Sequence, residues 1–484
     1  MQRAHVLVAL SISLCACSDL QRLLTDAAQN PHSGSGSGGH HSPPPTGDAG
    51  PGPVEPEPEP VTCGTVIGVD ELYADVRADL NRLDRGERRF ARYVTLAQQF
   101  NAGLCGAELD VGRVALREVL NGTSSSPVLV QAVAIDDRAL TYRFDLRSPG
   151  WNRALRVSGV DFDDGWEAVI AASPFAVEHT GPDAARVQAA TGTSVPLFAL
   201  DAFVDVATKN ELYYALVGVP ASSAALFAEL GVDTVASVAN GSARRAVTAN
   251  SRISRQDRIL ERYPLGARPG FLWSSQDFLA GGSGAFEQPL DAIGDARAVL
   301  YSLPNALSAF ALFDGAGTRV DSSDVLMDTT QNDFRARTAQ SCLNCHAAGV
   351  IPFADELRPQ VDAHPDRYSA EVVAAVQRLY PTSDELASVL AADARAQHDA
   401  QTRAGLPTSQ GSQAFQVSMR FAEGLGLAEL AGELLVSREE LLARLPELPP
   451  VLQRQPVERG AFAEVFQAGA CRLQTGRNRP RRCD

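Results

Sequence analysis

The sequence predicts an α+β protein that is mostly helical, with small antiparallel meanders. From Val69 to about Gly103 the apolar residues recur at helical spacing, with charged residues between them. Residues 129–147 and 298–320 instead form short runs rich in β-branched and aromatic residues, each broken by a turn signal. Both kinds of pattern therefore occur along one chain, which is typical of this class.

The N-terminal helical region contains two runs, of which the second, from Phe90 to Phe100, ends at the helix stop Asn101–Gly103. The elements expected after it are a strand over 129–135, a turn at Asp136-Asp137, a strand over 140–146, a helix over Trp166–Ser173 and more helix within Leu197–Leu216.

The C-terminal half begins with a meander and continues mainly as helix. Its expected elements are strands over 299–303 and 309–313, a turn at Asp314–Gly317, helices over Ala370–Leu379 and Asp384–Gln401, and a short helix over Arg438–Leu445. Two residue pairs have the spacing of N-terminal helix caps, namely Thr382 with Glu385 and Ser437 with Glu440. A strand is predicted from the alternation of apolar and polar residues at Phe415, Val417, Met419 and Phe421.

The composition argues against two classes of partner. Hydrophobic residues make up 45% and charged residues 21%, a globular balance, and the formal net charge is −15. Nucleic acid is not an expected partner, because polyanion binding requires a basic face. The same acidity argues against electrostatic docking on anionic lipid. A chain of 484 residues is too long for one ordinary core and suggests two or three domains.

Residues 1–17 are predicted to be a bacterial lipoprotein signal peptide. The mostly apolar run Val6–Leu14 is too short to span a bilayer as a helix. It ends at Leu14-Cys15-Ala16-Cys17, which resembles a lipobox with Cys17 as the lipidated cysteine, although Cys15 occupies a slot that a smaller residue usually holds. An ordinary secretory signal is the alternative. The expected location is the cell envelope, in the periplasm or at the outer membrane, with a lipid anchor in the membrane.

Residues 18–62 are expected to form a disordered tether. They contain a Gly/Ser run at 33–39, three prolines at 43–45 and a Glu-Pro repeat at 55–60. Such segments cannot bury enough apolar surface to offset the entropy of ordering. No later segment reaches 18 consecutive apolar residues, so no transmembrane helix is expected.

The eight cysteines divide by context. Two lie in the leader, two lie close together at Cys342 and Cys345, and four are scattered: Cys63, Cys105, Cys471 and Cys483. The scattered four could form two disulfides in an oxidising compartment, and three pairings are open. The pairs of shortest separation are Cys63 with Cys105 and Cys471 with Cys483.

The sequence Cys342-Leu343-Asn344-Cys345-His346 is the pattern of covalent c-type haem attachment. Two thiols one helical turn apart can each add to a vinyl group of one porphyrin, and the imidazole of His346 then lies beneath the ring and binds the iron. No thioredoxin-like βαβ pattern surrounds the motif, and a zinc site would need a further close ligand. An inert disulfide is the remaining alternative. The expected cofactor is one covalent haem c, held by Cys342, Cys345 and His346.

The second axial position of the iron has several candidates. Met419 is the first choice for a distal ligand, although its place in the expected strand also fits a core methionine. Met327, His364, His398 and an open sixth position are the alternatives. An open position would shift the function towards small-molecule binding or peroxide chemistry.

Two further sets are candidates for contact with the haem. The first could wall the porphyrin, or more simply form a structural Trp–Phe pair, and comprises Trp273, Asp277 and Phe278. The second recurs at a spacing of three on one possible helical face and comprises Arg252, Arg255 and Arg258. These guanidinium groups could pair with haem propionates, or form an ordinary solvated basic face.

Several stretches around these residues carry a family resemblance. They are Arg88–Tyr93 through Asn101–Leu104, Tyr142–Trp151, Ala190–Pro196, Asn250–Arg258, Trp273–Phe278, Tyr301–Asn305 and Ser341–Gly349. Through them, over about residues 70–445, the chain resembles an uncharacterised family of exported bacterial lipoproteins that end in a c-type cytochrome domain. The resemblance implies haem attachment at Cys342 and Cys345 and iron ligation by His346, and it names neither a reaction nor a distal ligand.

The sequence therefore predicts an envelope-anchored monohaem cytochrome with its haem module in the C-terminal half. The expected divisions are an N-terminal α+β domain at 63–265, a c-type haem domain at 266–405, and a C-terminal strand/helix segment with a tail at 406–484. Its expected role is single-electron transfer between redox partner proteins of the envelope. Two alternatives are a haem-dependent oxidoreductase or peroxidase-like enzyme, and a haem-bearing binding or sensor protein.

Overall fold

The computed structural model describes residues 63–249, 251, 253–254, 256–265, 270–279, 284–286, 288–290, 293–408 and 411–483. The expected signal peptide, Cys17 and the tether lie outside these residues. The fold is α+β, as predicted, with 44% helix and 18% strand in several small sheets. The described residues belong to one compact unit, and the expected boundary between residues 265 and 266 falls between two strands that pair in one sheet.

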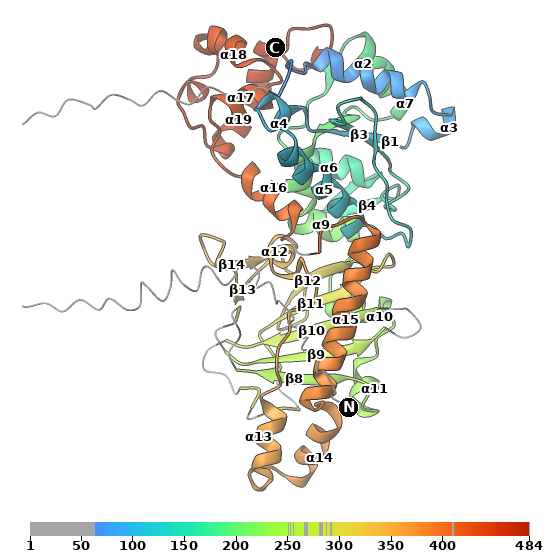
Figure 1. The fold of residues 1–484 in the computed structure, drawn as a ribbon, viewed down its shortest axis with the longest axis vertical. Coiled ribbons are helices and arrows are strands. Elements are labelled where there is room, and N and C mark those ends of the chain that lie inside the picture. The colour runs from blue at the N-terminus through green and yellow to red at the C-terminus, as the bar shows by residue number, and fades with distance from the viewer. Residues whose placement is uncertain are drawn as a thin grey trace, which may run out of the picture. The chain divides into compact units, whose positions relative to one another are not determined.

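The N-terminal part is built on a four-stranded sheet in the order β2-β3-β1-β7, with helices packed around it (Figure 1). Its elements, in chain order, are α2 (Val69–Leu80), α3 (Arg85–Arg88), β1 (Ala91–Thr95), α4 (Ala97–Asn101), α5 (Ala107–Gly122), β2 (Val133–Ala134), β3 (Thr141–Asp145), β4 (Leu155–Val157), β5 (Val160–Phe162), α6 (Gly165–Ala172), β6 (His179–Thr180), α7 (Pro182–Thr191), β7 (Leu197–Ala199), α8 (Leu200–Ala207), α9 (Asn210–Val217), α10 (Ser223–Glu229) and α11 (Thr234–Ala239).

The prediction of one helix over Phe90–Phe100 is wrong, because its first half is the strand β1. This strand pairs with β3 on one side and, in parallel, with β7 on the other, and all five of its residues are buried. Even Arg92 is buried there, where its guanidinium lies 3.2 Å from the carboxylate of Asp164. A strand covered on both faces shows no polar alternation, so its pattern could not be told from that of a helix.

The middle of the chain forms a five-stranded antiparallel sheet in the order β12-β11-β10-β9-β8. Its strands and the hairpin that follows them are β8 (Arg244–Thr248), β9 (Arg258–Pro264), β10 (Phe271–Asp277), β11 (Ala296–Ser302), β12 (Ser308–Asp314), β13 (Ser322–Met327) and β14 (Arg335–Arg337). The last two strands of the sheet are the predicted meander. The hairpin of β13 and β14 leads directly into the short helix α12 (Gln340–His346).

Both edges of this sheet are closed by side chains, as edge strands require when they do not pair further. On β12, the hydroxyl oxygens of Tyr213 and Tyr214 accept hydrogen bonds from the backbone N–H groups of Phe310 and Leu312, at 3.1 and 3.0 Å. On β8, the carboxylate of Asp355 accepts the N–H of Val247 at 2.8 Å. The tyrosines come from α9, so they fasten the N-terminal part to the sheet.

The C-terminal part is largely helical. Its elements are α13 (Leu357–Ala363), η2 (Pro365–Arg367), α14 (Ala370–Leu379), α15 (Ser383–Arg403), α16 (Gln413–Phe421), α17 (Leu427–Glu433), α18 (Arg438–Arg444), η3 (Leu445–Glu447), η4 (Pro450–Gln453), α19 (Arg459–Leu473) and β15 (Arg479–Pro480). The predicted bounds of α14 are confirmed, and the capping box of Thr382 and Glu385 is present at α15. Ser437 caps α18 as predicted.

Helix α15 runs along one face of the five-stranded sheet (Figure 1). Its Asp393 accepts two hydrogen bonds from Arg262 on β9 and one from Trp273 Nε1 on β10, each at 2.8 Å. A bidentate guanidinium–carboxylate pair with an added indole N–H fixes both position and orientation. Leu386 and Leu390 of the same helix pack into the core beneath it.

The predicted strand over Phe415–Phe421 is wrong, because this segment is the helix α16. Ser412 caps it, and the buried residues Ala414, Val417 and Phe421 follow helical spacing. This helix and those after it pack against α4, α5 and α8, in one core that joins residues 67–216 with 414–473 (Figure 1). The expected C-terminal segment is therefore part of the N-terminal core.

Two disulfides brace this joint core. Cys63 bonds to Cys105 and Cys471 bonds to Cys483, with Cα–Cα distances of 5.6 and 5.2 Å. They are the two pairings of shortest sequence separation among those that the sequence leaves open. In the described part of the chain, no helix is both long and apolar enough to cross a membrane.

We predict that Tyr214→Phe destabilises the protein by about 1–3 kcal/mol, the usual cost of leaving a buried polar group without its partner. The Tyr214 hydroxyl accepts from Leu312 N–H and donates to the Val320 carbonyl at 2.7 Å, so its loss leaves the N–H unpaired and the carbonyl with only the 3.4 Å hydrogen bond from Thr338. The measurement is the free energy of unfolding in denaturant. Tyr368→Phe is the control, because that half-buried hydroxyl accepts one hydrogen bond, from Gln360. Equal stability of the two variants would contradict the prediction.

Candidate haem-binding site

Helix α12 carries the Cys-x-x-Cys-His motif and is anchored at its N-terminal end from two directions. Thr338, which precedes it, hydrogen-bonds to the hydroxyl of Tyr214. Gln340 donates a 2.6 Å hydrogen bond to Ser418 on α16, and Ser418 donates in turn to Asp205 on α8, also at 2.6 Å. The helix that holds the motif is therefore fixed to the N-terminal core, to the edge of the sheet and to the C-terminal helices together.

The thiols of Cys342 and Cys345 lie one turn apart on α12, and neither takes part in a disulfide. Burial raises the pKa of the Cys342 thiol to about 12, and the neighbouring Cys345 acts in the same direction. Redox-active Cys-x-x-Cys pairs work with a lowered thiol pKa, which is the opposite arrangement. The described residues contain no group of three or more His, Cys, Asp or Glu side chains arranged around a metal ion.

The imidazole of His346 is oriented by the backbone of the loop that follows α12. Its Nδ1 lies 3.0 Å from the carbonyl oxygen of Gly349, which accepts the N–H of the ring. Gly349 has a φ of +99°, and a Cβ there would come within 3.0 Å of Cγ of Gln397 on α15, so the position requires glycine. Because Nδ1 carries the proton, Nε2 presents its lone pair, and no hydrogen bond to it comes from the described residues.

The electrostatic surroundings keep this imidazole neutral. Burial lowers the pKa of His346, and the positive charge of Arg258 lowers it further, whereas the hydrogen bond to Gly349 acts in the opposite direction. A neutral imidazole with a fixed tautomer is the form that binds a metal ion. The ring of Phe310 lies beside it, with 6.0 Å between the ring centroids.

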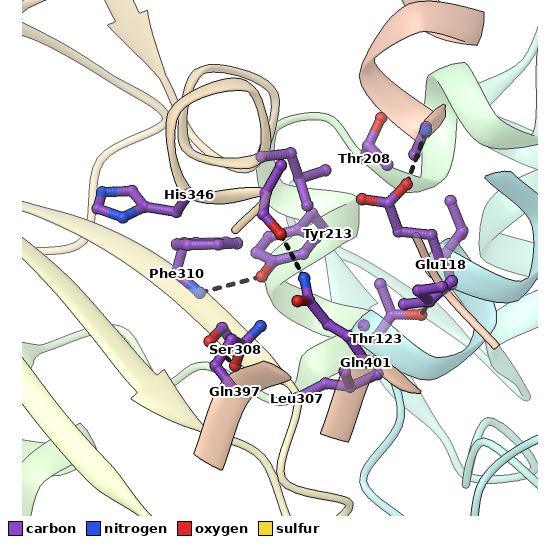
Figure 2. Close-up of a pocket in the computed structure, with 16 residues that line it drawn as sticks. Glu118, Thr123, Thr208, Tyr213, Leu307, Ser308, Phe310, His346, Gln397 and Gln401 are labelled. Carbon is purple, nitrogen blue, oxygen red and sulfur yellow. Dashed lines mark hydrogen bonds between the residues drawn. The ribbon is translucent and has the colours of Figure 1, made fainter. Parts of the chain in front are cut away.

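A small cavity adjoins α12 where the N-terminal core meets the sheet. Figure 2 shows His346 and Phe310 at one side of it and Glu118 with Thr208 at the other. Gln401 of α15 donates a hydrogen bond to the carbonyl of Ala347, and its own Oε1 is buried without a hydrogen-bond partner in the structure. The loop that positions Gly349 is thus held by α15, through Gln397 and Gln401.

The structure places the candidate distal ligands in different environments. Met419 lies on α16 with 37% of its surface exposed, and it does not line the cavity beside His346. His364 and His398 are exposed, on the end of α13 and on α15. Met327 is half-buried at the end of β13, next to Asp328, whose charge acts on Cys342.

The other predicted haem contacts have structural partners. Trp273 belongs to the core under α15 and Phe278 to a separate core beside α13, so they do not form the expected pair. Arg258 lies on strand β9 rather than on a helical face, and its guanidinium is held by the buried carboxylate of Asp277 and by Ser251. Arg252 and Arg255 lie outside the described residues.

Sequence reasoning missed the residues that orient the motif. Gly349 carried a signal, because it follows His346 at a spacing of three, where a backbone carbonyl can return to the imidazole. No sequence signal marked Tyr214, Gln397 or Gln401, because these residues lie far from the motif in the sequence and come close to it only in the folded chain.

Peptide mapping of the unreduced protein is expected to recover Cys63 linked to Cys105 and Cys471 linked to Cys483. In the structure each of these two pairs is bonded as a disulfide, whereas Cys342 and Cys345 belong to neither disulfide. Mass spectrometry after proteolysis measures the links, and a reduced digest is the control. A peptide that joins Cys342 to Cys345 would show that the motif is a disulfide instead.

Comparison with known proteins adds no further evidence on this site. The chain matches no protein-family model, no curated protein and no solved structure. Its function is therefore argued from the chemistry of α12 and its surroundings.

Proposed function

We propose that this protein is an exported c-type cytochrome that carries one covalent haem and passes single electrons between partners in the cell envelope. The observation that supports it best is the arrangement of α12. Two thiols outside the disulfides stand one helical turn apart, and the next residue is a neutral imidazole whose Nδ1 is held by a carbonyl. This set of donors fits a haem c, which needs two thiols and one ring nitrogen.

Each residue of the site has a definite task in this proposal. Cys342 and Cys345 would form the thioether bonds, and His346 would bind the iron through Nε2. The Gly349 carbonyl holds the Nδ1 proton, which fixes the ring and increases its basicity towards a metal. The bound haem supplies reversible one-electron chemistry, and the chain sets its potential through ligands, hydrogen bonds and burial.

The disulfides agree with the proposed location. Disulfides persist in oxidising compartments and are rare in the cytosol, so a chain with two of them fits an exported protein. The lipid anchor at Cys17 and the tether of residues 18–62 complete the proposal. Redox partner proteins of the envelope would then meet a haem domain held away from the membrane.

The purified mature protein is expected to carry the mass of one haem per chain and to give a c-type pyridine haemochrome spectrum. A Cys342→Ala/Cys345→Ala variant should lose the covalent haem completely, because both attachment points are gone. His346→Ala should keep the attachment yet change the visible spectrum, since the imidazole that would bind the iron is lost. Cys63→Ala/Cys105→Ala is the matched control and should retain the haem. A colourless wild-type protein with the mass of polypeptide and lipid alone would overturn the proposal.

A distal methionine would make the spectrum six-coordinate, low-spin and unreactive with carbon monoxide. We expect Met327→Ala to abolish that state and Met419→Ala to preserve it, because Met327 is half-buried at the end of β13, next to Asp328, whose charge acts on Cys342, whereas Met419 is 37% exposed on α16. Optical spectra of the three proteins measure this. A wild-type protein that is five-coordinate and turns over peroxide would instead favour the peroxidase-like alternative.

A further inference from the structure

The C-terminal end of the described chain carries a compact basic loop, although the formal net charge of the whole chain is −15. Residues 471–483, which we call the arginine loop, are closed by a disulfide and contain no acidic residue. Five arginines lie in this loop, and each of them is exposed: Arg472, Arg477, Arg479, Arg481 and Arg482. Like charges held so close together repel one another, which opposes a compact state.

Two buried residues fix the backbone of the arginine loop. Asn478 is fully buried, and its backbone and side-chain N–H groups donate to the carboxylate of Asp70 on α2, at 2.7 and 2.8 Å. Pro480 is buried as well and lies in β15, which pairs with β6. Arg479 stands between these two residues, so the alternation of a strand directs its side chain outward.

The packing of the loop on α7 holds it from a second side. Gly181 precedes α7 with a φ of +144°, and a Cβ there would collide with the backbone oxygen of Arg477. The side-chain oxygen of Asn478 accepts the N–H of Ala184 in α7 at 3.0 Å. The arginine loop is thus joined to α2, β6 and α7, so its backbone needs no further ordering before it binds a partner.

Most guanidinium groups of the arginine loop have no carboxylate partner among the described residues. Arg481 forms an ion pair with Glu178, the residue before β6. Asp70, the other acid in contact with the loop, accepts hydrogen bonds from the backbone N–H groups of Arg477 and Asn478 rather than from a guanidinium group. The other four arginines form no ion pair with a described residue. Their charge is therefore available to an anionic partner.

The arginine loop lies at the end of the folded chain where the proposed tether begins. Asp70, which holds the loop, follows Cys63 by seven residues, and a chain of that length spans at most about 25 Å. Figure 1 shows the C-terminal end of the chain beside α2. Residues 18–62 connect this end to the proposed lipid anchor at Cys17. Contact between the loop and the anchoring membrane is then intramolecular, and a weak attraction is sufficient for it.

We propose that the arginine loop docks the folded chain on an anionic lipid surface, with its guanidinium groups on the lipid phosphates. Guanidinium groups bind phosphate in a bidentate way, and each basic side chain near an anionic bilayer strengthens binding roughly fivefold. The net charge of −15 does not prevent this, because charges more than about 10 Å away are largely screened at 0.1 M salt. The choice of a lipid surface rests on the anchor in the proposed function, whereas the binding itself requires neither anchor nor haem.

The test is co-sedimentation with vesicles of the mature chain from Ser18, exported with an ordinary secretory signal so that it carries no lipid. This chain retains every described residue. We expect saturable binding to vesicles of equal parts phosphatidylcholine and phosphatidylglycerol, at least tenfold tighter than to phosphatidylcholine alone at about 0.1 M salt, and lost at about 1 M salt, where screening acts within about 3 Å. Equal binding to both kinds of vesicle, or binding to neither, would overturn the proposal.

Inorganic phosphate separates a lipid surface from the free ion as the source of the phosphate group. At constant ionic strength it should not release the chain from the anionic vesicles, because several guanidinium groups bind the surface together. Release by inorganic phosphate would contradict docking on lipid and would assign the loop to the free ion.

A triple variant assigns the binding to the loop. Arg477→Gln/Arg479→Gln/Arg482→Gln should weaken binding to the anionic vesicles at least tenfold. The substituted side chains are exposed, and the disulfide, Asn478 and Pro480 are retained, so the loop keeps its fold.

The matched control removes the same charge at exposed positions on η2 and α15, in Arg367→Gln/Arg395→Gln/Arg403→Gln. It should bind as the unmodified chain does. An equal loss in the two triple variants would show that overall charge, and not the arginine loop, attracts the chain to lipid.

Discussion

The backbone N–H groups along the outer edge of β12 impose the constraint on which the site depends. They need acceptors, and the hydroxyls of Tyr213 and Tyr214 supply two of them. Tyr214 also bonds to Val320 and Thr338, so one side chain joins α9, the sheet and the start of α12. The position of the Cys-x-x-Cys-His motif therefore follows from how a sheet edge is satisfied.

The loop after α12 fixes the orientation and the tautomer of the His346 imidazole. A left-handed glycine turns its carbonyl towards Nδ1 of His346, and α15 packs so closely on the same glycine that a larger residue would collide with Gln397. Burial and the Arg258 charge keep the imidazole neutral. Together these contacts fix a tautomer whose free nitrogen is Nε2, the atom a proximal ligand must present, and this is why the proposed haem attachment rests on more than a sequence pattern.

One apolar core joins the two ends of the described chain. Helices α16 to α19 return to pack on α4, α5 and α8, so residues far apart in sequence share one apolar interior. The buried acids Asp201 on α8 and Glu433 on α17 meet there, and Arg459 acts on both, while Arg420 also acts on Asp201.

Local sequence determined the elements whose signals are local. The capped helices α14, α15 and α18, the strands β11 and β12, and the spacing of Cys342, Cys345 and His346 were all readable from neighbouring residues. The remaining features depend on tertiary structure and could not be predicted from residues adjacent in the sequence. The strand β1 is buried on both faces and so lacks alternation, and the packing of α16 on α5 and α8 decides which of its residues are buried. The disulfide between Cys63 and Cys105 and the anchoring of α12 through Tyr214 and Ser418 likewise depend on contacts between distant segments. Such contacts form only when apolar surfaces far apart in the chain are buried together, and no local pattern encodes them.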